Sequence, residues 1–222
     1  MNTLLYKHQF LDVIDCPVVP GKAVCVGRNY SEHANELNNP LPQDPLLFLK
    51  PASAMVDMRE PIVVPTDRGT CHHELEVALL IGKTLTKENI DQHASAIVGV
   101  SLALDLTLRD LQSELKHQGH PWERAKAFDG SCPLSPFISA KNINIQNISL
   151  QLYRDQELLQ QGNTSQMLFS IPDVLASIVE NFTLYPGDVV LTGTPAGVGA
   201  LKPGMKLKAV LEDLIVVTTT VV

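Results

Sequence analysis

The sequence has few aromatic residues, no block of like charges and no long apolar run. Only 5% of its 222 residues are aromatic and 18% are charged, and the net charge is −7 at pH 7. Binding to nucleic acid or to an anionic membrane surface calls for a basic stripe. A membrane-spanning helix needs about 18 consecutive apolar residues. We therefore expect neither a nucleic-acid partner nor a membrane partner.

Cysteine is also scarce and is not arranged in CxxC pairs. The four cysteines are widely spaced, at Cys16, Cys25, Cys71 and Cys132. This pattern favours reduced, mostly buried thiols in a reducing compartment. The N-terminal residues interrupt their apolar positions with charge, unlike a secretory signal peptide. The sequence therefore predicts a cytoplasmic protein.

The 15 prolines and 13 glycines lie among many short apolar runs, a pattern typical of strands and turns rather than long helices. Strands are predicted at 22–26, 72–81, 100–106 and 189–193, with a hairpin over 148–162 that turns near Asp155. Helices are predicted over 87–99, 107–119 and 170–182, and after Asn29, which is expected to cap its helix in a capping box with Glu32. Residues 46–51 and 61–65 are expected to form edge strands or loops, and 121–129 a loop. The chain is thus predicted to be an α+β, mainly β domain with peripheral helices.

Two glutamates lie two residues apart on the best predicted strand. Period two places the side chains of Glu74 and Glu76 on one face, where adjacent carboxylates resist burial unless a cation lies between them. Asp105 ends the next buried strand and adds a third carboxylate. This oxygen donor set suits Mg²⁺, Mn²⁺ or Ca²⁺. A solvated strand face explains the two glutamates equally well, and His72 leaves open a less favoured iron site of the oxygenase kind.

A histidine and a glutamate share one face of the short helix predicted after Asn29. His33 and Glu36 are three residues apart, and a carboxylate beside an imidazole raises its basicity for proton transfer. By spacing alone, an ordinary exposed pair is the commoner explanation.

Further polar residues follow Asp105 along the chain. Arg109, Gln112 and Lys116 share a helix face that could hold a substrate carboxylate, although a solvated stripe is commoner. Lys126 lies between two alanines, where a charge has little structural use. The loop 193–199 is Gly-rich without a Walker ending, and its backbone N–H groups or the Thr194 hydroxyl could approach an anion.

Six segments together resemble the fumarylacetoacetate hydrolase family in order and spacing. They are VCVGRNYSEHANE (24–36), LLFLKP (46–51), HHELEVALLIG (72–82), ALDLTLRDLQ (103–112), PWERAKAFD (121–129) and LTGTPAGVG (191–199). The chain is most similar to the short acylpyruvase and oxaloacetate tautomerase–decarboxylase branch. This branch implies one catalytic domain over 1–222, with an N-terminal extension at 1–20 and the family core at about 21–222.

The resemblance implies roles for ten residues. It places Mg²⁺ or Mn²⁺ (Ca²⁺ in crystals) on Glu74, Glu76 and Asp105. It makes His33 and Glu36 the catalytic dyad and Lys126 a charge stabiliser, and it assigns substrate binding to Arg28, Arg109, Gln112 and Thr194. It also implies a mixed β-roll and a homodimer, and it does not make His72 a ligand.

The reaction implied is on a small 2-oxo or 2,4-dioxo acid. We expect C–C bond hydrolysis of an acylpyruvate, such as acetylpyruvate or fumarylpyruvate, ahead of oxaloacetate tautomerisation or decarboxylation. The bound cation would polarise the 2-oxo group and stabilise an enolate. A non-catalytic protein that binds metal and 2-oxo acid is the alternative from another class.

Overall fold

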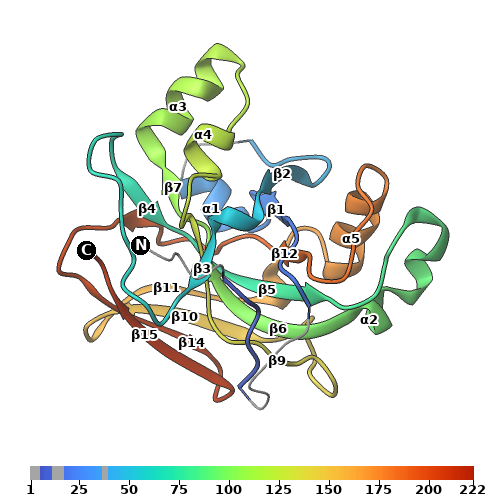
Figure 1. Cartoon of the computed structure of the whole chain (residues 1–222). Helices are drawn as coiled ribbons and strands as arrows, with labels where there is room; N and C mark the ends of the chain where they lie inside the picture. The colour runs from blue at the N-terminus through green and yellow to red at the C-terminus, as the bar shows by residue number, and fades with distance from the viewer. Residues whose placement is uncertain (1–5, 12–17, 37–39) are drawn as a thin grey trace.

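Two β-sheets packed face to face organise the fold. The computed structural model describes residues 6–11, 18–36 and 40–222 (Figure 1). The larger sheet has eight strands and the smaller has four. Helices lie around the periphery, with α3 and α4 standing on the side of β5 and β6 away from the smaller sheet. This arrangement confirms the mainly β fold with peripheral helices.

The larger sheet is mixed, because β1 pairs with β12 and β3 with β8 in parallel while its other pairs are antiparallel. In spatial order its strands are β2 (Leu46–Lys50), β1 (Ala23–Gly27), β12 (Val189–Leu191), β5 (Leu75–Ile81), β6 (Ile97–Leu104), β8 (Cys132–Leu134) and β3 (Met55–Asp57), with β9 (Ile138–Ser139) paired to β6. The prediction of an edge strand at 46–51 is confirmed by β2.

The smaller sheet is antiparallel and contains the predicted hairpin. Its order is β11 (Glu157–Asn163), β10 (Ser149–Arg154), β14 (Lys206–Leu211) and β15 (Ile215–Thr220). The hairpin turns at Asp155, whose φ is 54°. A three-stranded sheet joins β13 (Gly199–Ala200), β4 (Cys71–His73) and β7 (Thr107–Leu108).

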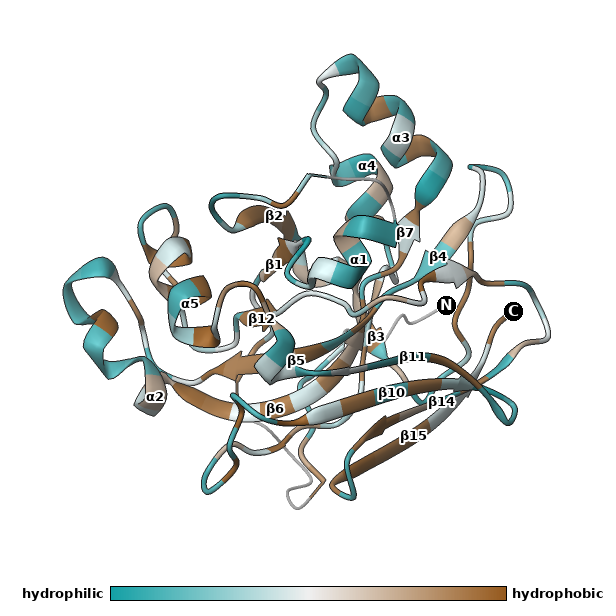
Figure 2. Ribbon diagram, turned by 180° about the vertical axis from the view of Figure 1, so that it is seen from behind, coloured by the Kyte–Doolittle hydropathy of each residue, from teal (hydrophilic) through white to brown (hydrophobic). Residues whose placement is uncertain are grey.

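Alternate residues of β5 enter two different hydrophobic cores, as period two requires. Val77 and Leu79 belong to the main core, which includes residues of the smaller sheet. Ala78 and Leu80 belong to a second core that contains Phe137. Apolar residues dominate β5 and β6 of the larger sheet, whereas β11 at the edge of the smaller sheet and α3 are largely polar (Figure 2).

The helices are short. They are α1 (Ser31–Glu36), α2 (His93–Ala96), α3 (Arg109–Gln118), α4 (Glu123–Lys126) and α5 (Ile171–Val179), with 3₁₀ turns at Ala52–Ala54, Lys87–Gln92 and Thr164–Gln166. The predicted start of α5 is confirmed, since Ser170 caps it in a box with Asp173. Among the described helices, none is long and apolar enough to cross a membrane.

The sequence-based boundaries are wrong in several places. The strand predicted over 72–81 breaks at Glu74, and β4 and β5 join different sheets. The helix predicted over 87–99 is a 3₁₀ turn followed by α2, and β6 already begins at Ile97. The loop predicted over 121–129 contains α4, a single helical turn.

The predicted capping role of Asn29 is also wrong. Its amide instead donates to the carbonyls of Phe169 and Thr192 at 3.1 and 2.9 Å and accepts from the Phe169 N–H at 2.8 Å. Asn29 therefore ties the chain before α1 to two distant segments.

Three of the four cysteines fall within the described residues, and Cys16 lies outside them. Cys25, Cys71 and Cys132 are buried and form no disulfide, in line with the prediction of buried thiols. Burial raises the pKa of Cys71 to about 11 and that of Cys132 to about 12. These thiols are therefore protonated at neutral pH and weakly nucleophilic.

Gly187 provides a test of the turn that precedes β12. Its φ is 95°, and a Cβ there would lie 2.0 Å from the Val19 carbonyl oxygen. Gly204 has a φ of 89°, and a Cβ added there would have nothing within 4 Å. Gly204→Ala therefore measures only the cost of a positive φ for a residue with a Cβ, about 1–2 kcal/mol. We expect Gly187→Ala to lower the free energy of unfolding by at least twice as much as Gly204→Ala in urea denaturation. Equal losses would contradict the close packing at this turn.

Candidate active site

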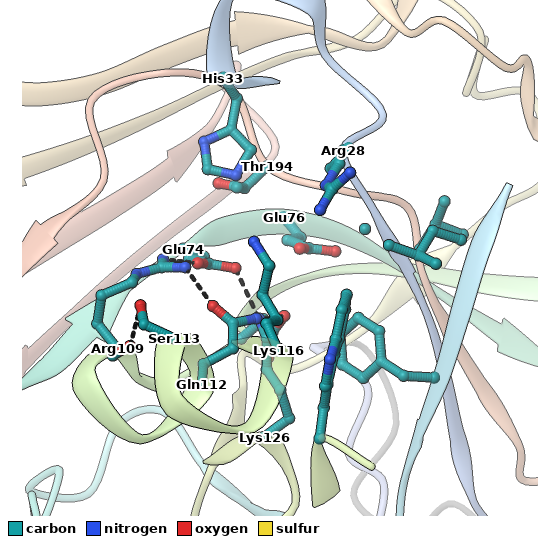
Figure 3. A pocket seen from close by; sticks show the side chains of 16 residues that line it. Arg28, His33, Glu74, Glu76, Arg109, Gln112, Ser113, Lys116, Lys126 and Thr194 are labelled. Atoms are coloured by element: carbon teal, nitrogen blue, oxygen red, sulfur yellow. Dashed lines mark hydrogen bonds and ion pairs between the residues drawn. The ribbon is translucent and has the colours of Figure 1, made fainter. Parts of the chain in front are cut away.

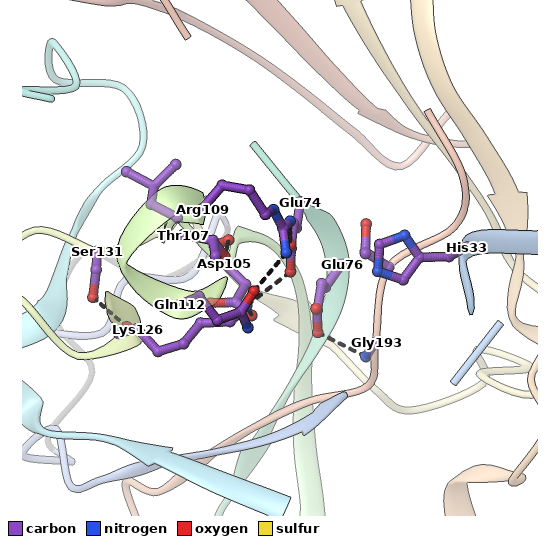
Figure 4. A network of polar contacts seen from close by, with 12 residues as sticks. His33, Glu74, Glu76, Asp105, Thr107, Arg109, Gln112, Lys126, Ser131 and Gly193 are labelled. Atoms are coloured by element: carbon purple, nitrogen blue, oxygen red, sulfur yellow. Dashed lines mark hydrogen bonds and ion pairs between the residues drawn. The ribbon is translucent and has the colours of Figure 1, made fainter. Parts of the chain in front are cut away.

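Three buried carboxylates meet where β5 begins and β6 ends. These strands are antiparallel, and the Asp105 N–H donates to the Glu74 carbonyl at 2.8 Å, so the two residues lie opposite each other. Glu76 follows two residues later on the same face, as its spacing predicted. One ligand atom from each residue lies within 4.8 Å of the others (Figure 4).

Basic side chains surround the three acids. Lys126 of α4 donates to Glu74 at 2.8 Å and to Asp105 at 2.5 Å, while Arg109 of α3 donates to Glu74. Lys50 at the end of β2 is fully buried, and its Nζ lies 2.8 Å from Asp105 Oδ1. Three carboxylates therefore face three cations.

Sequence reasoning missed Lys50. Its only signal is a lysine at the end of the apolar run LLFLK, which would equally suit a strand end whose ammonium reaches water. In the structure Lys50 instead donates to the Ser131 carbonyl at 3.0 Å and to Oγ at 3.1 Å. Lys50 and Lys126 pair with different oxygens of Asp105, Oδ1 and Oδ2.

The two glutamates have opposite electrostatic environments. Burial alone would raise the pKa of Glu74, but the charges of Lys126 and Arg109 hold it well below its ordinary value. Burial and the charge of Asp105 raise the pKa of Glu76, although the Gly193 N–H donates to it at 2.7 Å. These surroundings disfavour the charged form of Glu76. A cation bound beside it would stabilise that charged form.

The carboxylates fit a hard divalent cation. They offer oxygen ligands, which Mg²⁺ and Mn²⁺ prefer, and one such atom from each of the three residues lies within 4.8 Å of the others. His72 is not part of this cluster, which removes the support for the iron site considered above. Glu74, Glu76 and Asp105 are therefore the residues that could hold a metal.

The predicted imidazole–carboxylate pair lies beside these acids. His33 Nδ1 is 3.4 Å from Glu36 Oε2, and the Gly197 N–H donates to both Glu36 oxygens at 3.1 and 3.2 Å. Burial lowers the pKa of His33, although Glu74 and Glu36 oppose this. His33 is only 5% exposed, whereas Glu36 remains exposed, so the imidazole of the pair is withdrawn from solvent and its carboxylate is not.

A cavity of about 120 Å³ brings nearly all the predicted site residues together (Figure 3). Of the ten residues, Glu36 alone does not line it and lies behind His33. The lining residues among the ten are Arg28, His33, Glu74, Glu76, Asp105, Arg109, Gln112, Lys126 and Thr194. Lys116, which shares the helix face of Arg109, lines it as well.

The substrate-binding candidates differ in what their side chains already contact. Arg28 has a φ of 60°, uncommon for a residue with a Cβ, and no carboxylate of the described residues lies within 4.0 Å of its guanidinium. Arg109 donates to Gln112 at 2.7 Å. The Thr194 hydroxyl donates to the Leu75 carbonyl at 2.8 Å, so its proton is not directed at an anion.

The Gly-rich loop after β12 supports carboxylates of the protein. Its backbone N–H groups at Gly193 and Gly197 donate to Glu76 and Glu36, as described above. Gly193 has a φ of 100°, and a Cβ there would lie 2.7 Å from Cβ of Asn29, so this position requires glycine. One loop thus connects the acid cluster to the imidazole pair.

Comparison with known proteins shows what the chain is similar to. A family model described as fumarylacetoacetate (FAA) hydrolase C-terminal matches residues 22–222. Oxaloacetate tautomerase YcgM of Escherichia coli is 47% identical over 212 residues, 94% of this chain and 96% of that protein. The mitochondrial oxaloacetate decarboxylase of Dictyostelium discoideum is 40% identical, covering 87% of this chain and 89% of that protein.

Solved structures agree with the sequence comparisons. Fumarylpyruvate hydrolase from Pseudomonas aeruginosa, in complex with Mn²⁺ and pyruvate, superposes with a TM-score of 0.90 at 32% identity. The superposition covers 98% of this chain and 95% of that one. With a family model over nearly its whole length and relatives above 30% identity, this chain belongs to the fumarylacetoacetate hydrolase family, in its short branch.

Proposed function

We propose that this protein is a divalent-metal-dependent enzyme that interconverts the keto and enol forms of a small 2-oxo dicarboxylic acid of the oxaloacetate kind. The observation that carries the proposal is the meeting of three buried acids and a buried imidazole at one cavity. The 47% identity to an oxaloacetate tautomerase supports this choice of reaction.

The charges of the site suit an anionic substrate. Glu74, Glu76 and Asp105 would hold Mg²⁺ or Mn²⁺, which when bound acts as a Lewis acid on a substrate oxygen. The three carboxylates are balanced by Lys50, Lys126 and Arg109, so a divalent cation would leave an excess of two positive charges. A dicarboxylate matches that excess, and basic side chains at the cavity wall add to the attraction.

His33 is the proton carrier in this proposal. Its Nδ1 faces Glu36, which leaves Nε2 for the cavity that the ring lines. A neutral imidazole takes the proton from C3 of the keto form at Nε2, which leaves the enolate, and the imidazolium then gives that proton to the enolate oxygen to form the enol; the reverse transfers regenerate the keto form. Glu36 favours the imidazolium that forms, and Lys126 supplies fixed positive charge near the developing oxyanion.

A second candidate is hydrolysis of an acylpyruvate, which the sequence alone ranked first. It is supported by the similarity to a fumarylpyruvate hydrolase. Hydrolysis requires an activated water in addition to the groups named above, and the identity to the tautomerase is higher, so we place it second. Decarboxylation of oxaloacetate needs only the stabilised enolate. The homodimer and the cytoplasmic location stay predictions.

The metal site can be tested without assaying catalysis. Glu76→Gln keeps the size of the side chain but removes a charged ligand. Changes to groups that only support a ligand lower metal affinity roughly 10–100-fold. We therefore expect Mn²⁺ affinity, measured by calorimetry, to fall by more than this in Glu76→Gln. The control is Glu114→Gln, which alters an exposed acid of α3. Wild-type Mn²⁺ affinity in Glu76→Gln would contradict the metal site.

The dyad can be tested by comparing three reactions. In His33→Ala, we expect enol-oxaloacetate ketonisation and acetylpyruvate hydrolysis to fall by about 10²–10⁴-fold. Pyruvate release from oxaloacetate should fall much less, because it needs no proton carrier at C3 before CO₂ leaves. Mn²⁺ affinity should be unchanged, and His120→Ala, at an exposed histidine, should behave as wild type. Equal loss of all three reactions would show that His33 does not act as a selective proton carrier.

The pH profile tests the protonation state of His33. Burial lowers its pKa from the ordinary value of 6.5, so the neutral base persists as the pH falls through 6.5 and is lost only at lower pH. We expect the acid limb of kcat/KM below pH 6.5. Glu36→Gln removes a charge that raises this pKa, so the limb should move further down. A limb that moves upward in Glu36→Gln would rule out His33 as the titrating base.

A further inference from the structure

Gln160 of β11 is not among the residues that line the cavity, yet its amide bonds both the segment that carries Glu74 and Glu76 and the loop whose Gly193 N–H holds Glu76. Its Oε1 lies 2.9 Å from His73 Nδ1 and accepts from the Leu75 N–H at 3.0 Å. Its Nε2 donates to Thr194 Oγ1 at 2.8 Å and to the Pro195 carbonyl at 2.9 Å. The side chain is 1% exposed, and all four of its hydrogen-bonding positions are in use.

The position of these bonds explains why an amide is needed there. Leu75 lies between the two glutamates of the cluster, at an edge where β12 has already ended at Leu191. Its backbone N–H and C=O therefore have no ladder partner in β12 and must be satisfied in another way. Gln160 accepts from the N–H, and the Thr194 hydroxyl donates to the C=O at 2.8 Å. Two side chains thus continue the sheet beyond its last strand residue.

The same bonds connect β4 and β5 on either side of Glu74, where the strand is interrupted. His73 belongs to the three-stranded sheet and Leu75 to the larger one, and both bond to the same amide oxygen. On the other side of the amide, Thr194 follows Gly193, whose N–H holds Glu76 at 2.7 Å. Gln160 therefore sets the separation between the strand and the loop that orient two of the three carboxylates.

We infer that Gln160 is a positioning residue that sets the metal affinity of the acid cluster. This inference rests on the proposed metal site. Removing the amide leaves the Leu75 N–H without its acceptor and frees the loop from the strand, so Glu74 and Glu76 no longer share one fixed geometry. Loss of such supporting groups typically lowers metal affinity about 10–100-fold.

A control is available in the same region. Thr164 follows β11, is 3% exposed and accepts from the Ile148 N–H at 2.9 Å through its Oγ1. Thr164→Val removes the buried hydrogen bond to Ile148, which involves neither the strand nor the loop that Gln160 bonds. A purely structural role for Gln160 would make its loss resemble this control, with lower stability and unchanged metal affinity.

The experiment is Mn²⁺ calorimetry on the full chain, with circular dichroism to establish folding. We expect the Kd for Mn²⁺ to rise about 10–100-fold in Gln160→Met, which has similar length without hydrogen bonds, and to stay within about twofold in Thr164→Val. A folded Gln160→Met with the wild-type Kd would overturn the inference.

A second variant and the wild type complete the test. If Gln160→Met does not fold, the second variant is Gln160→Glu. It keeps an acceptor for His73 and Leu75 and loses the donor to Thr194 and Pro195. We expect its Kd for Mn²⁺ to rise above that of the wild type, by less than the 10–100-fold expected when the whole amide is lost. An unchanged Kd in folded Gln160→Glu would also overturn the role. Absence of Mn²⁺ binding in the wild type would overturn the proposed metal site and this inference together, which is distinct from failure at Gln160 alone.

Discussion

The site depends on the repulsion between three carboxylates that are buried side by side. Removing one charged carboxylate from water already costs several kcal/mol unless it is paired. Glu74, Glu76 and Asp105 are within 5% of full burial, so their neighbours must supply positive charge or N–H donors. Lys126 and Lys50 do this from opposite sides of Asp105, and the loop after β12 does it for Glu76. The short helix α4 brings Lys126 within hydrogen-bonding distance of Glu74 and Asp105.

The sheet topology explains how these charges come to one point. An antiparallel pair places the start of β5 against the end of β6, so residues 31 positions apart in the chain become neighbours. The same pair faces two cores, which makes its strands rigid. The imidazole pair, by contrast, lies on α1 at the periphery. The three carboxylates are thus held by the core, and the His33 imidazole is brought to them by a helix at the periphery.

The sequence predicted most of this site but not its supports. Period two was sufficient to place Glu74 and Glu76 on one face, and the apolar strand before Asp105 pointed to a third acid, because both patterns are local; that the shared face is buried rather than solvated could not be read from the spacing. Lys50 could not be predicted, since its acceptors come from residues 56 to 81 positions away. Asn29 was misassigned because a local capping pattern competes with bonds to Phe169 and Thr192. The residues on either side of the strand break at Glu74 likewise bond to Gln160, which lies 86 positions further along the chain than Glu74.

The use of backbone N–H groups at Gly193 and Gly197 has an evolutionary consequence. A donor that belongs to the main chain does not depend on the chemistry of a side chain, so selection in this loop acts on the path of the chain, which at Gly193 requires glycine, rather than on the identity of its functional groups. The support of Glu76 and Glu36 is inherited unchanged, and diversification of the reaction within one fold becomes possible without rebuilding the acid cluster.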